Sequence, residues 1–166
     1  DTSAPSAPGA VSSSSHDPAG TPVSDDTIDV AWGAASDTLS GVASYSYAFD
    51  GNPTGSCLGS STASLSATSG NLTDGSHYVH VCAVDSAGNT GAAIHGGPYV
   101  VDTVGPTGLV ISSTSHSPST WSNDNGVDLE FSGASDANGV AGYAVVYDQS
   151  PGTEPACAMT QAGATF

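Results

Sequence analysis

The sequence predicts an all-β protein made of two tandem β-sandwich units, the second of them incomplete. Three observations support this fold class. Short apolar runs alternate with polar residues at a period of two, turn residues separate these runs, and the chain repeats itself after about 100 residues, a usual size for one sandwich. No window keeps the 3.6-residue period of an amphipathic helix, so we expect almost no helix.

The side chains of each expected strand divide into two faces, because successive side chains of a strand point to opposite faces. In "TIDVAW", Ile28, Val30 and Trp32 share the buried face, and in "YSYAFD", Tyr45, Tyr47 and Phe49 share one face. In "HYVHVCAVD", Val79, Val81 and Ala83 lie on one face. The opposite face of the third run carries Tyr78, His80, Cys82 and Val84. Turn signals separate the runs, namely "DG" at 50–51 and 74–75, "SAGN" at 86–89 and "GGP" at 96–98.

The internal repeat sets the domain organisation. "SSSSHDP" at residues 12–18 returns as "SSTSHSP" at 112–118. Other pairs at offsets of roughly 100 residues are Asp1 with Asp102, His16 with His116, Trp32 with Phe131, Asp37 with Asp136, Tyr45 with Tyr143 and Cys57 with Cys157. We therefore assign residues 1–101 to the first copy and 102–166 to the second. The second copy lacks a counterpart of "LTDGSHYVHVCAVDSAGN", so we expect it to be truncated.

The charge balance excludes several function classes. The chain has no Lys or Arg and 16 Asp plus Glu, which gives a formal net charge of -16. Without cations it cannot neutralise nucleic-acid phosphates, supply the lysine of a P-loop or bind an anionic membrane surface. No apolar run approaches the roughly 18 residues of a membrane span, so we expect no direct membrane insertion. Two interpretations remain open: a solvated polyanion, or carboxylates that collect divalent cations.

Three longer segments carry a family resemblance. They are "LTDGSHYVHVCAVDSAGNTG" at 72–91, "SDTLSGVASYSYAFDG" at 36–51 and "WSNDNGVDLEFSGASDANGVAGYAVVYDQSP" at 121–151. Together they resemble the tandem immunoglobulin-like or fibronectin type III-like repeats of large bacterial surface and secreted proteins, over nearly the whole chain. The resemblance implies a seven-stranded antiparallel sandwich that serves as a spacer or adhesion module. Cys82 stands where this family usually has arginine.

The resemblance also implies a disulfide between Cys57 and Cys82, because their strands are neighbours in such sandwiches. It would close a loop of about 25 residues and stabilise the fold by about 3 kcal/mol. Cys157 repeats Cys57, and its partner is expected beyond Phe166. A disulfide in each repeat indicates an extracellular, secreted or cell-surface protein. The phrase "GSCLG" also looks like a nucleophile elbow, but the sequence offers neither a helix nor a Lys or Arg to activate a thiolate.

Calcium is the metal that the sequence favours, since no zinc motif and no EF-hand spacing occurs. Asp37, Asp85 and Asp102 lie near expected strand ends, where carboxylates at the junction of tandem sandwiches can bind calcium. The competing interpretation is that such aspartates only shape turns. No other cofactor is expected. Asn71 begins an "NLT" glycosylation sequon.

The histidines carry weaker signals. His16 and His116 occupy equivalent positions, which favours a structural hydrogen-bonding role over zinc binding. His77 follows "LTDGS", where related sandwiches place a corner aromatic, and is expected to be a packing residue. His80 and His95 carry little signal.

These patterns favour a structural role in a stalk, adhesin or filament component of a long extracellular protein, and not an enzyme. No nucleophile, base and oxyanion set can be assembled from the repeated positions. The expected partners are neighbouring repeats or like subunits. The alternative is a carbohydrate- or ligand-binding accessory module of a secreted protein, with surface glycans or proteins as partners. Exposed aromatic side chains would favour it, and Tyr78, Tyr99 and Trp121 are the candidates.

Overall fold

A computed structural model describes residues 1–149 and divides the chain into two compact units, Asp1–Val104 and a second that begins at Gly105. Every regular element in the described residues is a β-strand, which confirms the all-β prediction. The division falls a few residues after the boundary expected from the repeat. The two units are described separately below.

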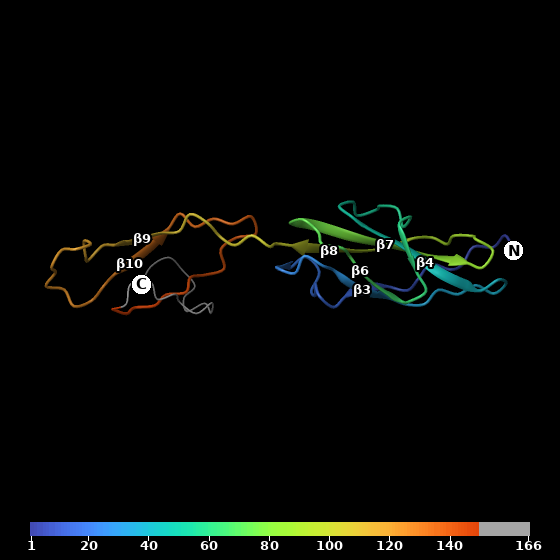
Figure 1. Ribbon diagram of the computed structural model, residues 1–166, viewed down its shortest axis with the longest axis horizontal. Helices are drawn as coiled ribbons and strands as arrows, with labels where there is room; N and C mark the ends of the chain where they lie inside the picture. Colours follow the sequence, from blue (N-terminus) through green and yellow to red (C-terminus); the bar gives the residue numbers. More distant parts are fainter. Residues whose placement is uncertain (150–166) are drawn as a thin grey trace. The chain divides into compact units, whose positions relative to one another are not determined.

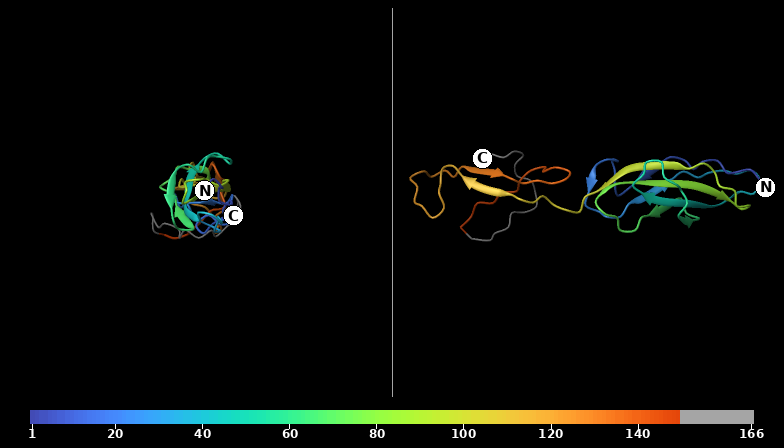
Figure 2. Two further views of the ribbon diagram at one scale, coloured as in Figure 1. Left: turned by 90° about the vertical axis from the view of Figure 1, so that its right-hand side faces the viewer. Right: turned by 90° about the horizontal axis from the view of Figure 1, so that it is seen from above.

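The first unit contains two sheets (Figures 1 and 2). One has the order β1-β3-β6, with β1 (Val11–Ser13), β3 (Asp29–Trp32) and β6 (Ser66–Thr68). The other has the order β2-β8-β7-β4-β5, with β2 (Pro22–Val23), β8 (Ile94–Val101), β7 (Gly75–Asp85), β4 (Val42–Asp50) and β5 (Ser60–Thr62). Buried side chains from both sheets form one core, which is the arrangement of a β-sandwich.

The sequence led us to expect wholly antiparallel sheets, but one strand pair of the first unit is parallel. The resemblance implied seven strands, but the first unit has eight, β1 to β8, because the chain crosses from one sheet to the other between β1 and β2. The second of these, β2, runs parallel to β8, with Pro22 opposite Val100 and Val23 opposite Val101. The other strand pairs of this unit are antiparallel.

The core follows the alternation seen in the sequence. Its buried members are Ile28, Val30, Trp32, Tyr45, Val79, Val81, Ala83 and Tyr99, with Tyr47 and Phe49 partly buried against them. The Trp32 ring lies 5.7 Å from that of Tyr45 and 6.2 Å from that of Tyr47. On β7 the opposite face is buried as well, because His80 and Cys82 are both 0% exposed. Something other than the second sheet must cover that face.

The second unit repeats the pairing of the first. Its β9 (Val110–Ser113) and β10 (Leu129–Ser132) are antiparallel, with Ile111 opposite Phe131. In the first unit Val11 lies opposite Trp32 in the same way. The register of β9 and β10 is therefore the register of β1 and β3.

The repeated "SSxSH" phrase forms one hydrogen-bond network in each unit. In the first, the Ser13 hydroxyl donates to the Asp29 carbonyl at 2.7 Å and accepts from the His16 backbone N–H at 3.0 Å, while the Asp29 backbone N–H donates to Ser15 Oγ at 2.9 Å. The second unit forms the same three bonds through Ser113, Ser115, His116 and Asp128. These bonds fasten the loop after the first strand to the strand beside it.

Candidate functional site

Three carboxylates meet at one end of the first unit. One oxygen from each of Asp1, Asp37 and Asp85 lies within 4.8 Å of the other two. Asp85 ends β7 and is 2% exposed, Asp37 precedes β4, and Asp1 is exposed. We call these three residues the acidic cluster.

The acidic cluster contains two of the three aspartates proposed for calcium from the sequence. Asp102 is not in it, since Asp102 follows β8, where its backbone N–H donates to the Val23 carbonyl at 2.9 Å. Asp1 takes the third place. The repeat could have indicated this, because Asp1 is the counterpart of Asp102 in the first copy.

Turn hydrogen bonds hold both loop aspartates in place. Asp37 Oδ1 accepts the backbone N–H groups of Leu39, Ser40 and Gly41 at 3.1, 2.8 and 2.9 Å. Asp85 Oδ1 accepts those of Ala87 and Asn89 at 2.9 and 2.8 Å, and its Oδ2 accepts Asn89 Nδ2 at 2.7 Å. Turn formation and metal binding are therefore compatible here, because the turns themselves bring the carboxylates together.

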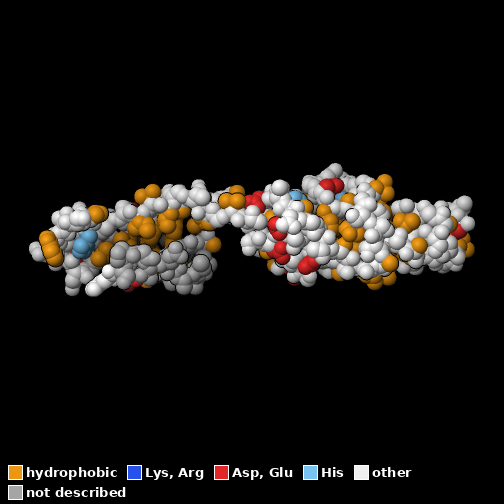
Figure 3. Space-filling model, in the orientation of Figure 1, with side chains coloured by type: hydrophobic (Ala, Val, Ile, Leu, Met, Phe, Trp, Pro, Cys, Tyr) orange, Lys and Arg blue, Asp and Glu red, His pale blue; other side chains and the backbone are white. Residues whose placement is uncertain are grey.

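The acidic cluster has no Lys or Arg to balance it, since the chain contains neither. Figure 3 shows the acidic side chains of the visible face set among uncharged atoms. Burial alone raises the pKa of Asp85, but the hydrogen bonds from Asn89 and from the Ala87 backbone N–H outweigh it and leave that pKa below its ordinary value. The carboxylate is thus ionised at neutral pH, and hard oxygen ligands of this kind suit Ca²⁺ or Mg²⁺.

Calcium is expected to stabilise the first unit through the acidic cluster. At calcium ten times the dissociation constant, the free energy of unfolding rises by about 1.4 kcal/mol, or several degrees in the thermal midpoint. Asp1→Asn should reduce this rise, because it removes one of the three carboxylates of the acidic cluster. Asp1 is exposed, so the change should leave the fold intact. The measurement is calorimetry with calcium and with chelator.

The matched control for calcium is Asp25→Asn. Asp25 is also exposed and also shapes a turn, through the Thr27 backbone N–H at 2.9 Å, but it lies outside the acidic cluster. This variant should keep the full calcium response. If chelator leaves the midpoint unchanged, or if the two variants respond alike, the acidic cluster does not bind calcium.

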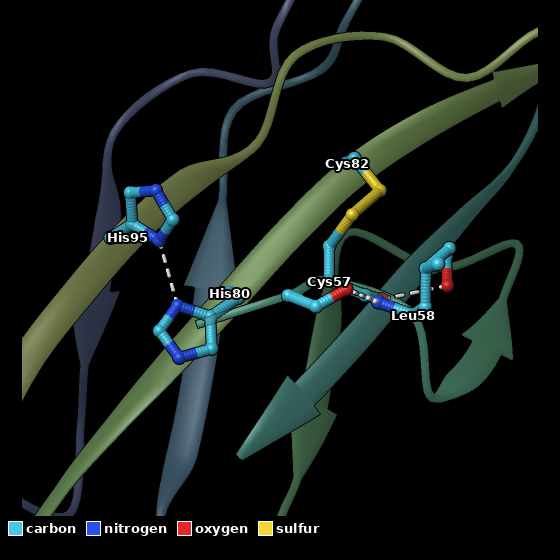
Figure 4. Close-up of a disulfide and its surroundings, with 7 residues drawn as sticks. Cys57, Leu58, His80, Cys82 and His95 are labelled. Carbon is cyan, nitrogen blue, oxygen red and sulfur yellow. Dashed lines mark hydrogen bonds between the residues drawn. A yellow bond between two sulfur atoms is a disulfide. The ribbon is translucent and has the colours of Figure 1, made fainter. Parts of the chain in front are cut away.

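A disulfide joins Cys57 to Cys82, the pair inferred from the sequence (Figure 4). The sulfurs are 2.06 Å apart and the Cα atoms 5.8 Å apart. It ties the loop of residues 51–59, between β4 and β5, to the outer face of β7. Because Cys57 is oxidised, it has no thiolate to act as a nucleophile. Cys157 lies outside the described residues.

The 51–59 loop covers the outer face of β7. The His80 side chain is fully buried there, and its Nε2 lies 3.0 Å from Asp50 Oδ1. Gly55 packs directly on this pair: a Cβ at that position would lie 2.5 Å from His80 Nε2 and would also overlap Asp50 Oδ2. The loop can approach His80 this closely only because residue 55 is glycine.

Gly55→Ala is therefore expected to destabilise the first unit by about 1–3 kcal/mol, the usual cost of overpacking a close contact. Gly51→Ala is the control from the same loop, since its Cβ would meet nothing nearer than the Ser76 carbonyl at 3.9 Å. Urea denaturation measures both variants. Equal effects from the two substitutions would show that the loop does not rest on His80.

The remaining candidates lie apart from these sites. His77 Nε2 donates to the Thr73 carbonyl at 2.7 Å, which gives it a hydrogen-bonding role at the start of β7. Tyr99 is 3% exposed and Tyr78 is half-buried, whereas Trp121 is fully exposed. Asn71 is exposed, and its Nδ2 donates to Asp26 Oδ2 at 2.9 Å.

Comparisons with protein-family models, curated proteins and solved structures found no match to this chain. Residues 1–149 contain no helix with the length and apolar character needed to cross a bilayer. The disulfide is consistent with an oxidising extracellular environment.

Proposed function

We propose that this chain is a structural repeat module of a long extracellular surface protein, built from tandem immunoglobulin-like or fibronectin type III-like sandwiches. The strand order of the first unit supports the fold assignment. The β1-β3-β6 sheet corresponds to strands A, B and E of such sandwiches, and β4, β7 and β8 to C, F and G. His77 bonds back to the Thr73 carbonyl, as the corner tyrosine of that fold does.

The observation that carries the proposal is the recurrence of one local structure in both units. The β1–β3 register and the hydrogen bonds of the "SSxSH" phrase return in β9 and β10 with matching partners. A domain with its own hydrophobic core can be repeated along a chain without a change in its fold, which suits a long extracellular protein. The repeat in the sequence thus has a matching local structure at β9 and β10, whereas residues 140–148, the counterpart of β4, form no strand in the described part of the second unit.

The path of the chain through the first unit suits a load-bearing module. The N-terminus lies at one end of this unit, and β8 leaves it at the other (Figure 1). From the N-terminus the chain passes first through β1, which is antiparallel to β3, and then through β2, which is parallel to β8. A pull on the two ends therefore slides β2 past β8, and the hydrogen bonds between them share the load instead of opening one by one.

A binding screen separates this proposal from the accessory-module alternative. The fully exposed Trp121 is the one observation that favours that alternative, because aromatic rings stack on sugars. We expect no specific binding of the chain on a glycan array. Specific binding that Trp121→Ala removes would replace the structural proposal with a carbohydrate-binding one.

A further inference from the structure

An open apolar hollow lies in the second unit. It has a volume of about 260 Å³, and its lining includes Leu109, Ile111, Phe131, Val140 and Tyr143. Phe131 is buried, whereas Leu109 is 49% exposed and Ile111 is 58% exposed. Figure 3 shows hydrophobic side chains gathered on the visible face of this unit. Large apolar side chains that are exposed together mark a surface on which another chain segment binds.

The first unit shows what covers the equivalent surface. The shared register of the strand pairs makes Val11 the counterpart of Ile111 and Trp32 that of Phe131. Val11 lies against β8, since a Cβ at Gly96 would come within 2.8 Å of Val11 Cγ1. Trp32 belongs to one buried core with the inward residues of β7. In the first unit, β7 and β8 therefore cover the surface that is open in the second.

Two equivalent core positions differ in burial. Ile28 and Val127 each precede the aspartate whose backbone carbonyl accepts the hydroxyl of the repeated serine. Ile28 is 0% exposed and packs in the core that β7 helps to form, whereas Val127 is 46% exposed. No counterpart of β7 or β8 occurs in the described residues of the second unit. Val127 is thus a core residue without the strands that bury its equivalent.

The segment after β10 points to the same partner. Residues 140–148 are the counterpart of β4 but form no strand. In the first unit β4 pairs with β7 along most of its length, with Tyr45 opposite Ala83. Because cross-strand pairs stabilise a strand, residues 140–148 are expected to become one when a β7-like strand pairs with them.

From these observations we propose that the second unit binds a pair of antiparallel strands with the chemistry of β7 and β8, presented by a further module of the same kind. The inference rests on the proposed function, because it treats the two units as copies of one module. The β7-like strand places alternate apolar side chains over the hollow, as Val79 and Val81 do in the first unit. The β8-like strand brings a glycine against Ile111, as Gly96 lies against Val11.

Charge does not oppose this partner. Residues 75–101, which include β7 and β8, contain one Asp, no Glu and no Lys or Arg. A chain with a net charge of -16 repels strongly acidic segments but has little charge to repel here. Backbone hydrogen bonds along the added strands supply affinity, and the alternating apolar side chains supply specificity.

Calorimetric titration of the full chain with a synthetic peptide tests the surface. The peptide has the sequence of residues 75–101 with Cys82→Ser, which prevents disulfide exchange. We expect one peptide to bind per chain and amide hydrogen exchange in residues 140–148 to slow when it is bound. A peptide that also carries Val79→Ser and Val81→Ser should bind at least about tenfold more weakly, because it buries less apolar surface.

Two variants of the chain locate the bound peptide. Ile111→Asp should weaken binding at least about tenfold, because it puts a charge into the apolar hollow. Leu58→Asp is the matched control, since Leu58 is 75% exposed in the first unit and should leave binding unchanged.

The inference is overturned if the first peptide does not bind, if the serine peptide binds as well, or if exchange in residues 140–148 does not slow. It is also overturned if Leu58→Asp weakens binding as much as Ile111→Asp. Peptide binding concerns the second unit alone, whereas the mechanical resistance of the first unit tests the proposed structural role, so a failure of one is distinguishable from a failure of the other.

Discussion

Trp32→Ala is expected to destabilise the first unit by about 4 kcal/mol, within the range for truncating a buried aromatic side chain. Trp32 is 5% exposed and packs between the two sheets against Tyr45 and Tyr47. Alanine would leave a cavity that the surrounding strands cannot close. Urea denaturation followed by circular dichroism measures the loss. A loss below about 1 kcal/mol would contradict the placement of Trp32 in the core.

Trp32→Phe is the matched control. The second copy has Phe131 at the equivalent position, so phenylalanine suits this strand. The buried Nε1–H of Trp32 has no hydrogen-bond partner among the described residues, and the change removes that unsatisfied donor. We expect Trp32→Phe to cost less than half as much as Trp32→Ala.

Replacing Cys57 and Cys82 together with alanine should lower the free energy of unfolding by about 3 kcal/mol. The disulfide spans 25 residues, and its removal restores the conformational freedom of that loop to the unfolded chain. The same change should release the 51–59 loop from the outer face of β7. Denaturation in urea measures the loss.

Reducing agent provides the control for the disulfide. It should destabilise the unaltered protein to nearly the level of the double variant and leave the double variant unchanged. Equal stability of the oxidised protein and the double variant would contradict the role given to this bond.

The sequence predicted the inward faces of β3 and β4 because a period of two is a local property of each strand. On β7 the alternation grouped Val79, Val81 and Ala83 on one face but did not show that this face is the inward one, because the opposite face is also largely apolar. The burial of His80 could not be predicted. It depends on a loop that folds back over the sheet, and no periodicity in that loop shows where it will lie.

The acidic cluster shows the same limit at a site. Asp37 and Asp85 were chosen because both lie near strand ends, and the structure brings them together. Asp102 was chosen for the same reason but lies beyond the end of β8. A strand end does not specify which end of a sandwich it occupies, since that depends on the direction of each strand in the sheet. The hydrogen bond between the His80 and His95 rings, whose Nδ1 atoms are 2.7 Å apart, likewise requires the register between β7 and β8.

A single-molecule force measurement tests the structural role most directly. With the chain held by its two ends, the first unit should resist and then open in one force peak, because β2 and β8 are loaded in shear. The 25-residue loop closed by the disulfide should stay hidden, and reduction should lengthen the released chain by about 80 Å. A chain that extends smoothly, with no force peak, would contradict the proposal that this protein is a load-bearing module.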